Sequence, residues 1–124
     1  MTSLNIVDSS GWLEYATGTD QGGLFAPAIE NLDDLLVSVI SIYEVFKKVL
    51  REKGERAALN TVGDMLSGRV INLDTSLAFE AARHTLPLAD SIIYATARRY
   101  KATLWTQDKD FDGLEYVKYF PKLT

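Results

Sequence analysis

The sequence of 124 residues contains no cysteine. A disulfide framework and a thiolate metal site are therefore excluded, and this absence fits an intracellular protein. No apolar run approaches the roughly 20 residues that a membrane-spanning helix needs. The first three residues lack the basic region of a secretory signal peptide. We therefore expect a cytoplasmic protein.

Positive charge is also scarce, because 13 Lys and Arg residues stand against 17 Asp and Glu residues, for a net charge of −4. Proteins that coat nucleic acid neutralise phosphates with an excess of Lys and Arg. The charge balance therefore disfavours that class. It does not exclude a nuclease, whose acidic centre holds metal ions while basic residues lie elsewhere.

Short apolar runs alternate along the chain with segments of helical periodicity. Strands are predicted at 4–7, 35–37, 70–73, 102–106 and 116–120. Helices are predicted around 12–16, 24–31, 42–50, 55–66, 77–82 and 87–100. This alternation is typical of parallel βαβ units. We predict an α/β fold, a three-layer α/β/α sandwich whose central, mainly parallel sheet has four to five strands, as a single domain over 1–124.

Four carboxylates follow predicted strands or open predicted helices. Asp8 directly follows the first strand, and Asp108 lies two residues beyond the fourth. Glu44 lies early in the helix after the second strand, and Asp90 lies in the first turn of a helix. Ligands of α/β sheets gather beyond the carboxyl ends of the strands, near the point where the strand order reverses. We therefore expect these four side chains to converge.

Each carboxylate also has an ordinary structural explanation. Asp8 suits a helix cap, and Glu44 precedes Lys48 by four residues, which is the spacing of a surface ion pair. Asp90 suits the positive end of a helix dipole, and Asp108 suits a turn. For any one residue alone this explanation is favoured. The joint occurrence of acids at strand ends favours a shared site.

For other polar residues we predict structural roles and no part in catalysis. Asp74 follows a strand but precedes an apolar helix, so we predict a helix cap. Residues 108–113 match the first half of an EF-hand calcium loop, yet Tyr119 occupies the position where that loop needs a glutamate. His84 lies at a helix end, which favours a dipole partner over a catalytic base.

Four segments in order resemble the PIN-domain family, and more narrowly the VapC-type toxins of type II toxin–antitoxin modules. They are residues 8–10 (DSS), 38–44 (SVISIYE), 88–93 (LADSII) and 106–111 (TQDKDF). The resemblance covers nearly the whole chain. It implies that Asp8, Glu44, Asp90 and Asp108 are catalytic and bind Mg²⁺ or Mn²⁺. It also implies that Ser9 and Thr106 support this acidic centre, with Asp110 as an outer-shell position.

The resemblance further implies a toxin that cleaves RNA. Such proteins are usually homodimers, and a VapB-like antitoxin silences them with a tail in the active-site groove. A non-catalytic PIN-like interaction module is the alternative. A phosphoacceptor receiver domain would need an acidic pair after the first strand, where Ser9 and Ser10 follow Asp8.

The connection at 85–89 is shorter than in most members of this family, so the usual dimer geometry stays an open question. Two basic stretches are candidate RNA contacts or ordinary exposed surface. They are Lys47, Lys48, Arg51, Lys53 and Arg56, and then Arg98, Arg99 and Lys101. Four apolar residues are expected in the core or in a groove for an antitoxin peptide: Trp12, Tyr15, Leu24 and Phe25.

Overall fold

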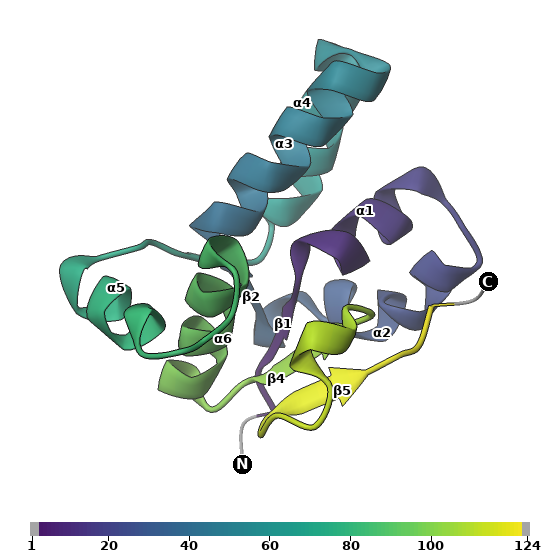
Figure 1. Ribbon diagram of the computed structural model, residues 1–124. Helices are drawn as coiled ribbons and strands as arrows, with labels where there is room; N and C mark the ends of the chain where they lie inside the picture. Colours follow the sequence, from purple (N-terminus) through teal and green to yellow (C-terminus); the bar gives the residue numbers. More distant parts are fainter. Residues whose placement is uncertain (1–2, 123–124) are drawn as a thin grey trace.

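The computed structural model describes residues 3–122 and contains a five-stranded parallel sheet with helices on both faces (Figure 1). The strands are β1 (Asn5–Val7), β2 (Leu35–Ser38), β3 (Arg69–Ile71), β4 (Thr103–Thr106) and β5 (Val117–Tyr119). Their order across the sheet is β3-β2-β1-β4-β5, and all four pairings are parallel. The predicted α/β/α sandwich is confirmed.

Six α-helices and three short 3₁₀ turns connect the strands of the described residues. The helices are α1 (Ser9–Thr17), α2 (Ala26–Ile29), α3 (Val39–Lys53), α4 (Glu55–Met65), α5 (Thr75–Ala82) and α6 (Leu88–Tyr100). The turns are η1 (Gln21–Leu24), η2 (Leu32–Asp34) and η3 (Lys109–Phe111). Helix α2 is shorter than predicted, because Pro27 fits only the first turn of a helix and α2 therefore begins at Ala26.

Helix ends follow local chemistry. The Asp8 side chain caps α1, and Gly18 ends this helix in the left-handed conformation with φ 70°. Ser38 caps α3, and Gly54 separates α3 from α4 with φ 90°. Helices α3 and α4 pack as a hairpin that projects away from the sheet (Figure 1).

Both faces of the sheet are buried, as expected for parallel strands. Because side chains alternate along a strand, Val7 and Val37 join an apolar cluster with residues of α1 to α4, including Trp12 and Phe25. The alternate residues of the same strands join a second cluster with α6. Trp12 and Phe25 are therefore core residues.

No helix among residues 3–122 is both long and apolar enough to cross a membrane. The chain forms β1, β2 and β3 toward one edge of the sheet and then β4 and β5 toward the other. The order thus reverses between β1 and β4. A ligand is expected in the crevice beyond the carboxyl ends of these two strands.

Candidate active site

Asp8 follows β1 and lies against β4. Its backbone N–H donates to the Trp105 carbonyl at 3.2 Å, which continues the pairing of the two strands. The side chain is 3% exposed. It accepts hydrogen bonds from Thr106 Oγ1 at 2.6 Å, Gly11 N at 2.9 Å and Ser10 Oγ at 2.9 Å. The Asp8 side chain thus caps α1, as one interpretation predicted, and also lies at the candidate site, as the other predicted.

Burial raises the pKa of the Asp8 carboxyl, and the hydrogen bonds from Thr106, Gly11 and Ser10 oppose that rise. The nearby charge of Asp108 raises the pKa further. A carboxylate that is buried but well supplied with donors is held in a fixed orientation. Asp8 is therefore a buried carboxylate of the site whose orientation is fixed by hydrogen bonds.

Glu44 reaches the same region from α3. Ser9, the first residue of α1, donates a hydrogen bond from Oγ to Glu44 Oε1 at 2.6 Å. This contact joins two helices that follow different strands. It fixes the carboxylate of Glu44 toward the centre of the site.

Asp90 lies in the first turn of α6 and is partly buried. Its pKa is raised to about 7, first by burial and then by the charges of Asp108, Asp8, Glu44 and Asp110. Five carboxyl groups from distant parts of the chain are therefore close enough to interact. Their mutual repulsion disfavours the fully ionised state.

Asp108, Asp90 and Asp110 form the tightest group. Each offers a carboxylate oxygen, and these three oxygens lie within 4.8 Å of one another. Asp108 is held from both sides, because its N–H donates to Thr106 Oγ1 at 2.9 Å and its Oδ1 accepts from the Asp110 N–H at 2.9 Å. Oxygen atoms at this spacing suit a hard divalent cation.

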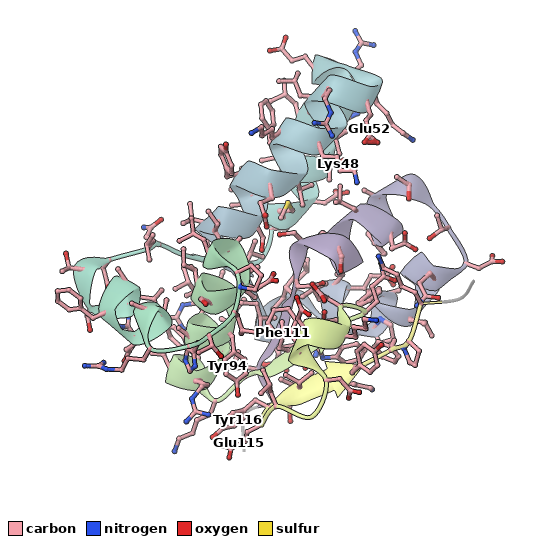
Figure 2. The ribbon with its side chains drawn as sticks, in the orientation of Figure 1. Lys48, Glu52, Tyr94, Phe111, Glu115 and Tyr116 are labelled. Carbon is pink, nitrogen blue, oxygen red and sulfur yellow. The ribbon has the colours of Figure 1, made fainter. Side chains whose placement is uncertain are left out.

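Aromatic packing holds the segment that carries Asp108 and Asp110. Phe111 is fully buried, and its ring lies 6.3 Å from that of Tyr94 on α6. The Tyr94 hydroxyl donates to the Glu115 carbonyl at 3.0 Å. Figure 2 shows these side chains where α6 meets the chain between η3 and β5. The two acidic segments are therefore positioned by one shared cluster.

A cavity adjoins the carboxylates on each side. One, of about 470 Å³, is lined by Ser10, Gln107, Asp108, Lys109, Tyr119, Pro121 and Lys122. The other, of about 360 Å³, is lined by His84, Thr85, Leu86, Pro87, Tyr94, Asp110 and Leu114. Each hollow thus includes one carboxylate of the tight group, Asp108 in the larger and Asp110 in the smaller.

Arg98 and Arg99, which belong to the second basic stretch, have different surroundings. Arg99 forms ion pairs with Asp74 at 3.4 Å and Glu80 at 2.8 Å, which ties α6 to α5. Arg98 is exposed, and its guanidinium lies 5.9 Å from the centre of the Tyr94 ring. Arg98 thus remains available to a ligand, whereas Arg99 has a structural role.

Several residues lie outside the site as predicted. Asp74 caps α5, accepting from Leu77 N at 2.7 Å. The segment 108–113 lies between two strands and has no EF-hand helices. His84 packs edge-on against Tyr94 at 4.9 Å and does not join the carboxylates.

The structure brings the four predicted residues near one another but distributes them differently from the prediction. Asp90 and Asp108 form the tight group, while Asp8 and Glu44 lie outside its 4.8 Å limit and act on Asp90 through their charge. Asp110, expected in an outer shell, completes the group instead. Its spacing of two residues from Asp108 was the available signal.

Comparison with known proteins gives a consistent picture. A family model described as "PIN domain" matches residues 6–115. A chain of a toxin–antitoxin complex from Klebsiella pneumoniae has a TM-score of 0.81 at 21% identity, covering 95% of this chain and 99% of that chain. The Sarcin-Ricin loop cleaving toxin VapC20 from Mycobacterium tuberculosis has a TM-score of 0.75 at 20% identity, covering 94% and 98%.

A chain of DNA-bound VapBC from Salmonella typhimurium has a TM-score of 0.72 at 14% identity, with 98% of both chains covered. No curated protein matches the chain. At these identities the solved structures are evidence for the fold.

Proposed function

Because this chain belongs to the PIN-domain family, we propose that it is an endoribonuclease that hydrolyses RNA phosphodiesters with Mg²⁺ or Mn²⁺. The observation that carries the proposal is the group formed by Asp90, Asp108 and Asp110, whose oxygens lie within 4.8 Å of one another. Asp8 and Glu44 complete the proposed centre, since their charges act on Asp90.

The donor set fits a divalent cation. Carboxylate oxygens are the ligands that Mg²⁺ and Mn²⁺ prefer, whereas no thiolate is available. Burial, and after it the repulsion from four neighbouring carboxylates, raises the pKa of Asp90 to about 7, and a bound cation would offset that repulsion. Asp90, Asp108 and Asp110 would hold the ion directly, with Asp8 and Glu44 beside it.

A bound divalent cation polarises a phosphoryl oxygen and lowers the pKa of a water molecule. The protein supplies fixed orientation: Thr106 and Ser10 hold the Asp8 carboxylate, and Ser9 holds Glu44. In-line attack of water on phosphorus would form a new P–O bond and break the bond from phosphorus to the 3′ oxygen of the upstream ribose. That oxygen takes up a proton, so the products are a 5′-phosphate and a 3′-hydroxyl. Exposed cations near the site, such as Lys109, would offset phosphate charge.

The proposal is tested by cleavage of single-stranded RNA of random sequence in Mn²⁺ and in EDTA. Cleavage is expected in Mn²⁺ alone. Asp108→Asn is expected to slow it by more than about 100-fold, since losing an outer-shell partner alone costs 10–100-fold. Asp112→Asn is the matched control, because Asp112 is exposed and outside the tight group. Equal rates for both variants would contradict the proposal, and a wild-type protein that never cleaves would favour a non-catalytic interaction module.

The chain is further proposed to be the toxin of a toxin–antitoxin pair, with a VapB-like antitoxin as partner. The support is its likeness to chains of toxin–antitoxin complexes. A groove between α1 and α3 offers both signs of charge, with Lys48 and Glu52 on the side of α3 that faces α1 (Figure 2). Expression of the chain alone is expected to stop growth, and co-expression of the antitoxin to restore it.

A homodimer is proposed on the surface of α5 and α6. Leu88 on α6 and Phe79 on α5 are 79% and 64% exposed, which makes them the most exposed large apolar side chains among the described residues. Light scattering is expected to give twice the monomer mass, and Leu88→Lys is expected to give the monomer mass. A monomeric wild-type protein would contradict this arrangement.

A further inference from the structure

The larger of the two hollows beside the carboxylates has the chemistry of a nucleotide site. Its volume of about 470 Å³ is lined from three segments that meet at the carboxyl ends of the strands: the start of α1, the chain after β4, and the chain from β5 onward. Asp108 is common to this cavity and to the tight carboxylate group. A molecule in the cavity would therefore lie directly beside a phosphodiester at the carboxylates.

Gln107 is the unusual residue of this cavity. It is 5% exposed, yet its Oε1 atom has no hydrogen-bond partner among the described residues. A buried acceptor without a partner costs free energy, so the Gln107 side chain gains a hydrogen bond if its amide turns toward a donor on a molecule in the cavity. Gln107 lies between Thr106, which bonds to Asp8, and Asp108, so its backbone is fixed by the site itself.

The remaining lining residues supply positive charge and an aromatic ring. Lys109 and Lys122 are exposed and line the cavity together with Tyr119, which is half-buried. Lysine ammonium groups bind phosphate. Aromatic rings stack on unpaired bases, and a glutamine amide pairs with a base edge that offers a donor and an acceptor.

We propose that this cavity binds the nucleotide next to the scissile phosphodiester and that Gln107 selects its base. Lys109 and Lys122 hold the adjoining phosphate, and Tyr119 stacks on the base. The inference rests on the proposed ribonuclease function and assigns it a specificity site. Gln107 is then the residue that decides at which position the RNA is cut.

Nucleotide binding is measured without cleavage. The ¹⁵N-labelled protein is titrated in Mg²⁺ with AMP, GMP, CMP and UMP, and side-chain amide resonances are followed by NMR. The Gln107 amide pair is expected to shift with at least one nucleotide. The amide pair of Asn60, on the projecting α4, is expected to stay in place. A Gln107 resonance that ignores all four nucleotides would overturn the proposal.

Base selection is measured by mapping cut ends in random single-stranded RNA with Mn²⁺. Wild type is expected to prefer one base at a position adjoining the cut, and Gln107→Ala to reduce that preference by about fivefold or more. Wild type without a preference there, or Gln107→Ala with the wild-type preference, would overturn the inference.

Lys122→Ala and Lys118→Ala form a matched pair. Lys118 does not line the cavity, and its Nζ lies 4.1 Å from the centre of the Trp105 ring. The slope of the logarithm of the RNA-binding constant against the logarithm of salt concentration counts phosphate contacts. Lys122→Ala is expected to reduce this slope by the equivalent of about one contact, and Lys118→Ala to leave it unchanged. Equal slopes for the two variants would remove Lys122 from the site.

The NMR titration and the mapping of cut ends together separate the possible failures. If wild type cuts no RNA, the ribonuclease function fails, while the NMR titration still decides whether the cavity binds nucleotides. If wild type cuts RNA but Gln107 affects neither the titration nor the cut position, only the specificity site is lost.

Discussion

Thr106 at the end of β4 donates a hydrogen bond from Oγ1 to Asp8 Oδ2 at 2.6 Å, and both side chains are buried. The same oxygen of Thr106 accepts from the Asp108 N–H at 2.9 Å. One hydroxyl therefore joins the carboxylate after β1 to the acidic segment after β4. The arrangement of the acidic centre depends on this bridge.

Thr106→Val keeps the volume of the side chain and removes the bridge. We expect the free energy of unfolding to fall by about 1–3 kcal/mol, because the buried Asp8 carboxylate loses a donor. Thr96→Val is the matched control: the hydroxyl of Thr96 is also buried but bonds only to the Ile92 carbonyl of its own helix. That variant should change stability by less than about 1 kcal/mol. Urea denaturation measures both, and equal losses would argue against the bridge.

The raised pKa of Asp90 leads to a prediction of how the stability of the metal-free protein depends on pH. Its pKa is raised to about 7 in the folded protein, from an ordinary value of 3.8. Between these values the unfolded chain loses the proton that the folded protein keeps, so the contribution of Asp90 to stability is largest at low pH and is lost as pH rises toward 7.

Urea midpoints in EDTA at about pH 5 and about pH 7.5 measure this effect. Asp90→Asn is expected to flatten the decline, and to be more stable than wild type at the higher pH. The decline that remains reflects Asp8, whose pKa is also raised. A variant with the full wild-type decline would show that the pKa of Asp90 is not raised in the folded protein.

Ser9 predicts a loss of activity without a loss of fold. Ser9→Ala releases Glu44 from its 2.6 Å hydrogen bond. Partners that orient an acidic ligand contribute roughly 10–100-fold to activity, so we expect kcat for RNA cleavage to fall by about tenfold or more, with KM little changed. Ser67→Ala, in the turn between α4 and β3, is the control and should retain full activity. Full activity of the Ser9→Ala variant would show that catalysis does not depend on the hydrogen bond from Ser9 to Glu44.

Two glycines predict stability changes of opposite sign. A Cβ at Gly11 would lie 2.6 Å from Val7 Cγ1 and 2.8 Å from the Phe25 ring, in the core under α1. Gly11→Ala is expected to destabilise the protein by about 1–3 kcal/mol. A Cβ at Gly63 in α4 meets nothing within 4 Å, so Gly63→Ala is expected to stabilise by about 0.5–1 kcal/mol. Thermal unfolding of both variants checks the pair, and a shift of the same sign would contradict it.

The sequence predicted most elements and the position of the acidic residues at strand ends, because hydrophobic periodicity is a local signal and because strands that alternate with helices indicate a parallel sheet. It placed Asp110 only in an outer shell, whereas in the structure a carboxylate oxygen of Asp110 lies within 4.8 Å of oxygens of Asp90 and Asp108. This position depends on the turn in which the Asp110 N–H donates to Asp108 Oδ1.

Long-range pairing was also beyond the sequence. Arg98 and Arg99 are adjacent and were one candidate RNA surface. Only Arg99 finds Asp74 and Glu80, which lie 25 and 19 residues earlier in the chain. Likewise, the burial of Gln107 depends on chain segments that are distant in the sequence and meet at the site.

The anomalous scattering of manganese in a crystal grown with Mn²⁺ measures the acidic centre most directly. The account predicts a peak that contacts carboxylate oxygens of Asp90, Asp108 and Asp110, and no such peak in Asp108→Asn crystals. A wild-type crystal with manganese elsewhere on the surface and none between these three side chains would contradict it.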